Sequence, residues 1–247
     1  MKINSIKSSL TLSASIMTVL VFMQGASFAQ KHHVPTGGRL AIVVDEHLSA
    51  LRAAPSPSAR LIERLSRGRF VAIIARNSGP EGLTFYRVKI TRRRSGWIQS
   101  DALISSSQAA DDDRLMRLIR SSEDFELIAR ARIFLEAFPN SSLRPTVLLL
   151  YGDTAEALSE KLSREAGRRL DQKEIAASGA PEFSYFLNYN ALDRYNRQNA
   201  HFIFYRNAKQ FHYDGAVWRE IVHRYPNSPE AVEARKRLAT LAPFLKN

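Results

Sequence analysis

The apolar positions between residues 48 and 103 repeat with a period of two. Tyr86, Val88 and Ile90 alternate with polar residues, which is the pattern of a β-strand with one buried face. Glycines stand where tight turns between such strands are expected, at Gly68, Gly79, Gly82 and Gly96. The pattern therefore predicts several short, half-buried strands over residues 39–105.

Beyond residue 111 the apolar positions repeat about every three and a half residues, which is the period of an amphipathic helix. Four helices are expected, with apolar faces over residues 127–138, 147–162, 218–225 and 231–241. Pro139 ends the first of them, and Pro145 suits the first turn of the second. The aromatic segment in between predicts a helix near Phe183–Tyr195, and the alternation within residues 201–205 leaves a short strand open.

Two junctions between these helices carry the same motif. Phe138-Pro139-Asn140-Ser141-Ser142 and Tyr225-Pro226-Asn227-Ser228-Pro229 each place an aromatic residue at the end of one helix and a proline that stops it. An Asn-Ser pair then stands ready to cap the next helix. An antiparallel helical hairpin is expected at each junction.

The strand region resembles a known family in the order and type of its residues. Leu51-Arg52-Ala53-Ala54-Pro55-Ser56 opens it, Phe85-Tyr86-Arg87-Val88-Lys89-Ile90 follows, and Gly96-Trp97-Ile98 closes it. These segments resemble a bacterial SH3 (SH3b) domain, a small β-barrel that binds cell-wall peptides or other proteins. The resemblance implies a binding role and no catalysis. Where the eukaryotic relatives have a Pro-Ser-Asn-Tyr stretch, this chain has Gln99-Ser100-Asp101-Ala102. The resemblance therefore does not imply polyproline recognition.

The last helical hairpin, from Tyr213 to Arg235, resembles a tetratricopeptide-type repeat of the sort found in bacterial envelope proteins. The first hairpin matches that pattern less closely, so an irregular helical-repeat domain is expected. Together the two resemblances imply an α+β multidomain fold. In it a small SH3-like β-barrel is followed by an all-α, TPR-like domain of helical hairpins.

The N-terminal residues have the pattern of a secretory signal peptide. Lys2 and Lys7 precede an apolar run over residues 10–23, and Ser27-Phe28-Ala29 supplies a small-x-small cleavage site. We therefore expect export to the periplasm or the medium, with no integral membrane segment after cleavage. The sequence contains no cysteine, so we expect neither disulfides nor a lipid-modified cysteine in the mature protein.

Composition shifts along the chain divide it into five expected parts. They are a signal peptide (1–29), a flexible arm (30–38), an SH3-like barrel (39–105), a linker (106–111) and a TPR-like helical domain (112–247). Residues 38–105 hold 12 basic and 5 acidic side chains, whereas residues 106–247 hold 21 and 19. The barrel is thus the basic part, which favours an anionic ligand.

The sequence motifs of the common enzyme classes are missing from the mature chain. It has no nucleophile elbow, phosphate loop, dinucleotide glycine pattern or zinc-binding pair of histidines. None of its six histidines stands at catalytic spacing from an acid along the sequence, and the lack of cysteine excludes a papain-like wall peptidase. We expect no enzyme, no cofactor and no metal site.

Aromatic and basic residues of the barrel are the candidate ligand contacts. One ring of the pair Phe85 and Tyr86 is expected in the core, and the other beside a groove. Trp97 is either a platform for a ligand or a structural residue, and the structural role is favoured. The run Arg92, Arg93 and Arg94 is either a solvated hairpin tip or a cationic contact, since guanidinium groups bind carboxylate and phosphate bidentately.

The helical domain offers a second set of candidates. Tyr189, Arg194, Tyr195 and Arg197 combine aromatic and basic side chains that suit a peptide on a concave helical surface. The other interpretation is that these residues are packed between helices.

The leading functional hypothesis is a non-enzymatic exported adaptor or scaffold. Its barrel docks on a component of the cell envelope, and its helical domain binds a protein partner. The alternative is a peptidoglycan-binding accessory protein, and a second alternative is an enzyme with an unrecognised site in the helical domain. The expected partner is an anionic protein or envelope polymer, and no nucleic acid.

Overall fold

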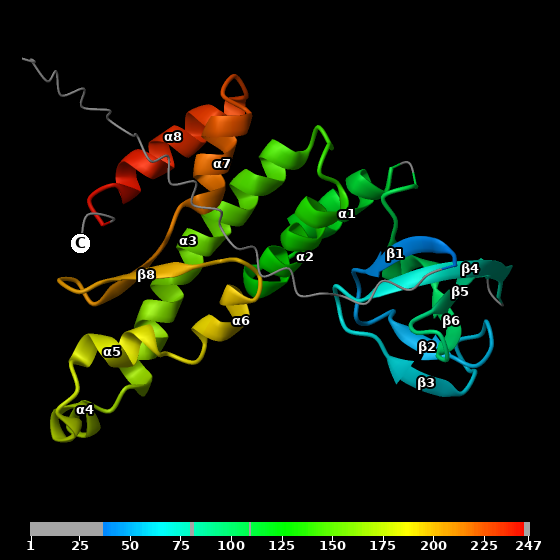
Figure 1. Cartoon of the computed structure of the whole chain (residues 1–247), viewed down its shortest axis with the longest axis horizontal. Helices are drawn as coiled ribbons and strands as arrows, with labels where there is room; N and C mark the ends of the chain where they lie inside the picture. Colours follow the sequence, from blue (N-terminus) through cyan, green and yellow to red (C-terminus); the bar gives the residue numbers. More distant parts are fainter. Residues whose placement is uncertain (1–36, 80–81, 109, 245–247) are drawn as a thin grey trace, which may run out of the picture. The chain divides into compact units, whose positions relative to one another are not determined.

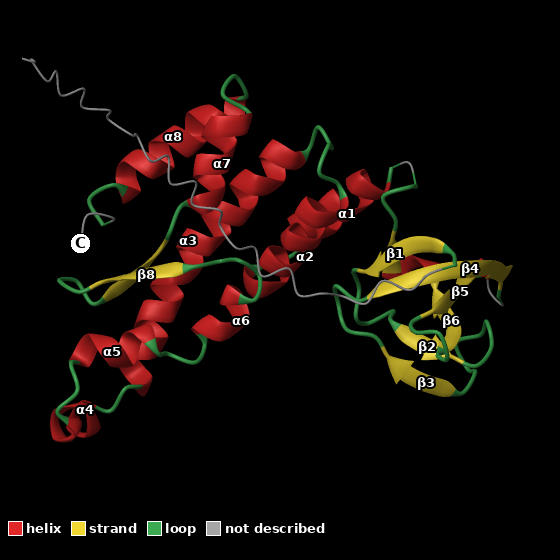
Figure 2. Ribbon diagram, in the orientation of Figure 1, coloured by secondary structure: helices red, strands yellow, loops and turns green. Residues whose placement is uncertain are grey.

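The computed structural model describes residues 37–79, 82–108 and 110–244. The expected signal peptide and nearly all of the expected arm lie outside the described residues. Strands fill the N-terminal part of this range and helices most of the remainder (Figures 1 and 2). We call residues 37–108 the sheet half and residues 110–244 the helical half.

The predicted alternating segment forms one antiparallel sheet of seven strands. They are β1 (Arg39–Val43), β2 (Ala50–Arg52), β3 (Leu61–Arg64), β4 (Phe70–Ser78), β5 (Thr84–Lys89), β6 (Ser95–Gln99) and β7 (Leu103–Ile104). Their spatial order is β3-β2-β6-β5-β4-β1-β7, and no pairing within the described residues joins β3 to β7. The sheet is therefore open, whereas the sequence suggested a closed barrel.

The sheet half has an interior of its own. Leu51, Val71, Val88 and Ile98 are fully buried in it, because alternate residues of each strand point to the same face. Ile90, just after β5, is 2% exposed and joins the same cluster. The predicted period of two thus gives this half its core.

The helical half contains the four helices that the sequence predicts. Its helices are α1 (Asp111–Arg120), α2 (Asp124–Ala137), α3 (Arg144–Arg169), α4 (Gln172–Ser178), α5 (Glu182–Leu187), α6 (Leu192–Asn196), α7 (Ala216–Arg224) and α8 (Pro229–Leu241). Pro139 follows the end of α2, and Pro145 lies in the first turn of α3. The Ser228 side chain accepts a hydrogen bond from the Ala231 amide and caps α8.

Two expectations for the middle of this half are wrong. The single helix expected near Phe183–Tyr195 is interrupted, since α5 ends at Leu187 and α6 begins at Leu192. The asparagines 188 and 190 of the interruption favour turns over helix interiors. Further on, β8 (Phe202–Tyr205) and β9 (Gln210–Tyr213) pair as an antiparallel hairpin, so the helical half is not all-α (Figure 2).

The two halves share hydrophobic side chains where they meet. Ile42, Val44 and Ile104 of the sheet half pack in the same buried cluster as Leu115 and Ile128 of the helical half. All three are at most 6% exposed. Both halves belong to one compact unit, although the described residues between Ser105 and Ala110 form neither helix nor strand.

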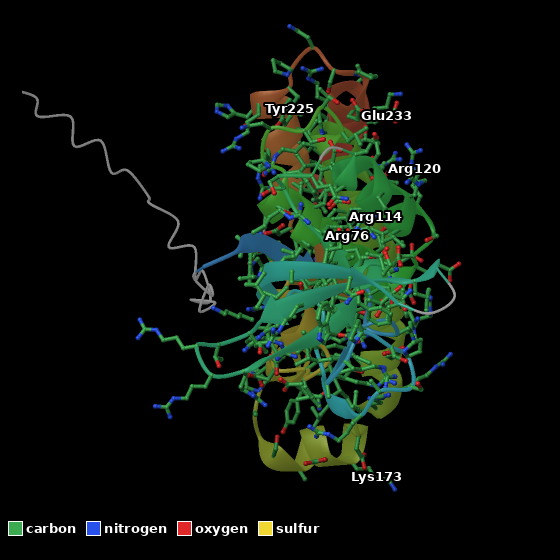
Figure 3. The ribbon with its side chains drawn as sticks, turned by 90° about the vertical axis from the view of Figure 1, so that its right-hand side faces the viewer. Arg76, Arg114, Arg120, Lys173, Tyr225 and Glu233 are labelled. Carbon is green, nitrogen blue, oxygen red and sulfur yellow. The ribbon has the colours of Figure 1, made fainter. Side chains whose placement is uncertain are left out.

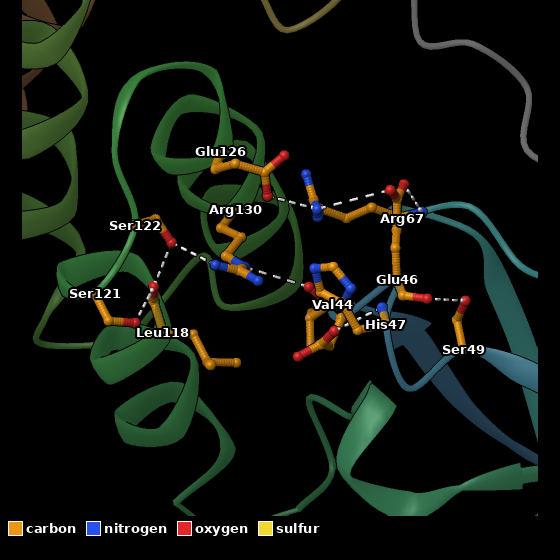
Figure 4. A network of polar contacts seen from close by, with 11 residues as sticks. Val44, Glu46, His47, Ser49, Arg67, Leu118, Ser121, Ser122, Glu126 and Arg130 are labelled. Carbon is orange, nitrogen blue, oxygen red and sulfur yellow. Dashed lines mark hydrogen bonds and ion pairs between the residues drawn. The ribbon is translucent and has the colours of Figure 1, made fainter.

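Charged side chains surround this junction (Figure 4). Arg130 of α2 donates to the Val44 carbonyl over 3.3 Å and to the Ser122 hydroxyl over 2.5 Å. Arg67 of the sheet half lies 2.6 Å from a Glu126 carboxylate oxygen, with its side chain only 10% exposed. Such partly buried, charge-assisted bonds hold the two halves in one arrangement.

Two buried tyrosines of the helical half give a testable pH dependence. Tyr151 donates to the Gln198 carbonyl over 2.8 Å, and the Tyr213 hydroxyl accepts from the Val217 amide over 3.0 Å. Burial, as the largest cause, raises the pKa of both phenols far above the ordinary value of about 10. The folded state therefore holds protons that the unfolded state releases at high pH.

We expect this stabilisation to be complete below about pH 10 and to be lost progressively as the pH rises above it. The chain has eight tyrosines, and absorbance at 295 nm should show Tyr151 and Tyr213 ionising only when the protein unfolds. Tyr151→Phe should remove one late-ionising group from the titration. Ionisation of all tyrosines in one step near pH 10, with the circular dichroism spectrum unchanged, would contradict the prediction.

Candidate functional site

A groove lies beside β4, where that strand runs on past its partner β1. β1 begins at Arg39, which pairs with Ile73, whereas β4 continues to Ser78. The groove has a volume of about 1010 Å³. The residues that line it come from the first residue of β1, from β4 and β5, from β7 with the turns before and after it, and from α1. Those used below are Arg39, Ile73, Ile74, Ala75, Arg76, Tyr86, Asp101, Leu103, Ile104, Asp111, Arg114 and Arg117.

Two local features of the backbone shape this groove. A Cβ atom on Gly38 would come within 2.5 Å of the Ile73 carbonyl oxygen, so glycine allows the chain to approach β4 there. Gly37 has φ +90°, which turns the chain at the same end of the groove. On β4 the register with β5 shifts between Ile73 and Ala75, so Ile74 is the extra residue of a β-bulge.

The two acidic side chains of the groove are already hydrogen-bonded within the protein. Asp111, 4% exposed, accepts from the Ser105 amide over 2.8 Å and from Arg114 over 3.3 Å. Arg114 also donates to the Asp101 and Leu103 carbonyl oxygens. The Asp101 carboxylate accepts from the side-chain Nε2 of Gln99 over 3.1 Å.

Three other arginines of the groove have no carboxylate partner among the described residues. They are Arg39 on β1, Arg76 on β4 and Arg117 on α1, and all three are exposed. The Arg39 guanidinium lies 5.6 Å from the centre of the Tyr86 ring. Figure 3 faces the side of the molecule on which Arg76 and Arg114 lie. The groove thus combines an excess of positive charge with the apolar side chains of Ile73 and Ile74.

The candidate residues of the sheet half do not all lie at this groove. Tyr86 lines it, half-buried, whereas Phe85 is 2% exposed in the interior. Trp97 is half-buried on β6, outside the groove lining. Of the pair, Tyr86 is therefore the residue that a ligand in the groove would meet.

The three consecutive arginines lie at the turn between β5 and β6, away from the groove lining. Arg92, Arg93 and Arg94 are all exposed. Arg94 makes an ion pair of 3.1 Å with Glu63 of β3. The guanidinium groups of Arg92 and Arg93 have no partner within the described part of the chain. They form a positively charged surface that is separate from the groove.

The structure does not gather the four candidates of the helical half into an exposed surface. Tyr189 and Tyr195 are 6% and 1% exposed. Arg194 donates to the Tyr195 hydroxyl over 2.6 Å and stacks on that ring, while Arg197 is exposed nearby. The tyrosines therefore pack between elements, in agreement with the second interpretation of the sequence.

A histidine–carboxylate pair escaped the sequence reasoning. His212 Nδ1 lies 2.9 Å from Glu156 Oε1, and the other Glu156 oxygen accepts from the Tyr213 amide over 2.7 Å. The Phe244 ring stacks on His212, with their centres 4.0 Å apart. Because Glu156 lies on α3 and His212 on β9, no local motif reveals the pair. Phe244 covers the imidazole, so the pair connects α3, β9 and the chain after α8.

Metal-site geometry, helix hydrophobicity and comparison with known proteins do not identify the class of this protein. In the described ranges, no three histidine, aspartate or glutamate side chains converge as a metal site would require, and the helices there are too short or too polar to cross a membrane. Comparison with protein-family models, curated proteins and solved structures gives no match. The groove is therefore the main structural evidence on function.

Proposed function

We propose that this protein is a non-enzymatic exported adaptor. Its sheet half docks on an anionic component of the cell envelope through the groove beside β4, and its helical half binds a protein partner. The observation that carries the proposal is the set of three exposed arginines, Arg39, Arg76 and Arg117, around one groove. Their charges have no carboxylate partner within the described residues, and guanidinium groups bind carboxylates in pairs of parallel hydrogen bonds.

The proposal includes the two family resemblances of the sequence. An SH3b-like identity for the sheet half is supported by its short antiparallel strands and tight glycine turns. A TPR-like identity for the helical half is supported by the helix pairs α2–α3 and α7–α8, in each of which an aromatic-proline turn joins the two helices. The β8–β9 hairpin is an insertion relative to such a repeat.

The junction between the halves suits an adaptor that holds two partners at a set separation. Val44 and Ile104 pack into the helical interior, and Arg130 ties α2 to the Val44 carbonyl. A flexible linker would let the two binding surfaces move independently. Here the buried contacts oppose such movement.

The alternative function is that of a peptidoglycan-binding accessory protein, in which the same groove holds the carboxylates of wall peptides. The unpaired charges of Arg76 and Arg117 favour it as much as they favour an acidic protein. The two functions differ in the macromolecule that is retained. A single pair of variants addresses both.

Arg76→Gln with Arg117→Gln should reduce retention of the mature protein on its envelope ligand by about tenfold, because two charge-assisted bonds are lost. The matched control is Arg92→Gln with Arg93→Gln, which removes the same charge from exposed residues outside the groove and should change retention less than about threefold. Retention is measured by sedimentation with purified sacculi and by affinity capture of envelope proteins on the immobilised full chain.

If the protein binds sacculi and the groove pair, Arg76→Gln with Arg117→Gln, loses this binding, the accessory function is supported. Saturable binding of an envelope protein would support the adaptor. If the control pair loses the binding and the groove pair keeps it, the docking site lies at the β5–β6 turn and the groove assignment is wrong. If the wild-type chain retains nothing above an unrelated basic protein, both functions lose their basis.

A further inference from the structure

We propose that the groove binds an acidic protein segment in an extended conformation, which adds as a strand to the free side of β4 at residues 75–78. This inference rests on the proposed function and names the class of partner for the same groove. It follows from the backbone of β4, from the apolar and charged side chains of the groove, and from the composition of the chain that precedes β1.

The backbone of β4 has a free side at the groove. β5 pairs with β4 from Ala72 to Ser78, but β1 pairs with it only from Phe70 to Ile73. In an antiparallel pair, alternate residues direct both their N–H and their C=O groups away from the partner strand. Two of the four residues 75–78 therefore point these groups toward the side that lacks a strand in the described part of the chain.

All four of these residues are exposed to solvent. Exposed edges of this kind are where extended peptides add to sheets. The bulge at Ile74 separates the part of β4 that pairs with β1 from this free part. Four residues of an added strand would extend over about 13 Å.

The side chains of the groove match a strand whose residues alternate in character. Ile73, Ile74 and Tyr86 give it an apolar surface beside β4. Arg76 lies on β4 and Arg117 on α1, so the basic side chains reach the groove from two different elements. Arg76 pairs with Tyr86 in the β4–β5 register, so both project from the same face of the sheet. Because successive side chains of a strand point to opposite faces, every second residue of an added strand can present a carboxylate to the arginines on that face.

The distribution of the arginines favours several carboxylates over one phosphate group. A phosphate site draws donors together on a single anion, often backbone amides at a glycine-rich turn. Here the guanidinium groups without a carboxylate partner among the described residues belong to β1, β4 and α1. An acidic segment can present a carboxylate to each.

The composition of residues 30–36 argues for a partner from another protein over the chain's own N-terminal arm. That stretch, Gln-Lys-His-His-Val-Pro-Thr, contains Lys31 and no acidic residue, so its charge has the same sign as the groove. Pro35 has no amide hydrogen to donate to a sheet edge. Gly37, with φ +90°, turns the chain just before β1.

The test is a calorimetric titration of the mature chain with the acetylated, amidated peptide (Glu-Val)4. Two further versions carry N-methyl groups either on the valine amides or on the glutamate amides. Only one set of alternate amides can face β4, so one version should bind at least about tenfold more weakly and the other within about threefold of the parent peptide. (Lys-Val)4 should not bind at the same concentrations.

The groove pair Arg76→Gln with Arg117→Gln should weaken (Glu-Val)4 binding about tenfold, and the control pair Arg92→Gln with Arg93→Gln should leave it within about threefold. A peptide of residues 30–36 should not displace (Glu-Val)4 at equal concentration; displacement would mean that the arm occupies the edge and would overturn the inference. Equal affinity of both N-methylated versions would also overturn it, while the cationic, anion-binding groove of the proposed function would stand. If the protein sediments with sacculi but binds none of the acidic peptides, the inference is likewise wrong and the proposed function stands.

Discussion

Gly152→Val should destabilise the protein by about 3 kcal/mol, although glycine is usually among the poorest residues for a helix interior. Gly152 lies on α3 under the Trp218 ring, and a Cβ atom there would stand 2.4 Å from the indole nitrogen. Trp218 is 1% exposed on α7 and meets the Tyr213 ring edge-on at 5.5 Å, so it has no free space into which to move. The added methyl groups must therefore push α3 and α7 apart.

The same helix supplies the matched control. Gly167 has no atom within 4 Å of an added Cβ, so Gly167→Ala should stabilise the protein by about 0.5–1 kcal/mol. Urea unfolding followed by circular dichroism gives both free energies. If Gly152→Val unfolds within about 0.5 kcal/mol of the wild type, the close approach of α3 and α7 is not a tight one.

Val44→Asp should cost about 4 kcal/mol and should lower the stability of both halves together. Val44 is fully buried in a cluster of apolar side chains, so an aspartate there would lose its hydration. The nearby Arg130 guanidinium already donates to the Val44 carbonyl and to the Ser122 hydroxyl, so it would compensate the new charge only in part. The chain has two tryptophans, Trp97 in the sheet half and Trp218 in the helical half. Labelling with 5-fluorotryptophan gives a separate ¹⁹F resonance for each half without a further substitution.

In the wild-type chain both resonances should lose their native positions at the same urea concentration, and in Val44→Asp both should do so at a lower one. Leu40→Asp on β1 is the control, because Leu40 is 37% exposed and should tolerate the charge within about 0.5 kcal/mol. A shift of only one resonance in Val44→Asp would show that the halves unfold independently.

The elements that sequence reasoning identified are those with local determinants. The end of α2 and the start of α3 depend on Pro139 and Pro145, whose effects act within a turn. In the β8–β9 hairpin, β8 forms where the alternation within residues 201–205 left a strand open. The second strand was not foreseen, because Phe211 and Tyr213 alternate with only one intervening residue, which is too short a pattern to indicate a strand. The open sheet was not foreseen, since closure depends on whether the distant edges β3 and β7 pair.

The groove shows a similar division. Tyr86 was identified because an aromatic pair on a strand places one ring on each face. Arg39, Arg76 and Arg117 were not, because only the pairing of β1 with β4 and the return of the chain into α1 bring them to one place. The excess of basic residues in the sheet half was the available signal, and the conspicuous run Arg92 to Arg94 drew attention to another site.

β1 reaches the groove through Arg39 and the helical interior through Ile42, a separation of about 10 Å along one strand. Pairing with β4 holds it from Arg39 to Ile42 on one side, and pairing with β7 holds Ile42 and Val43 on the other. A pull between a partner on β4 and a partner on the helices would reach β1 through these hydrogen bonds and through the packing of Ile42, so several contacts would have to break together. In the proposed adaptor, contacts that share a load in this way would resist rupture better than a strand peeled from its end.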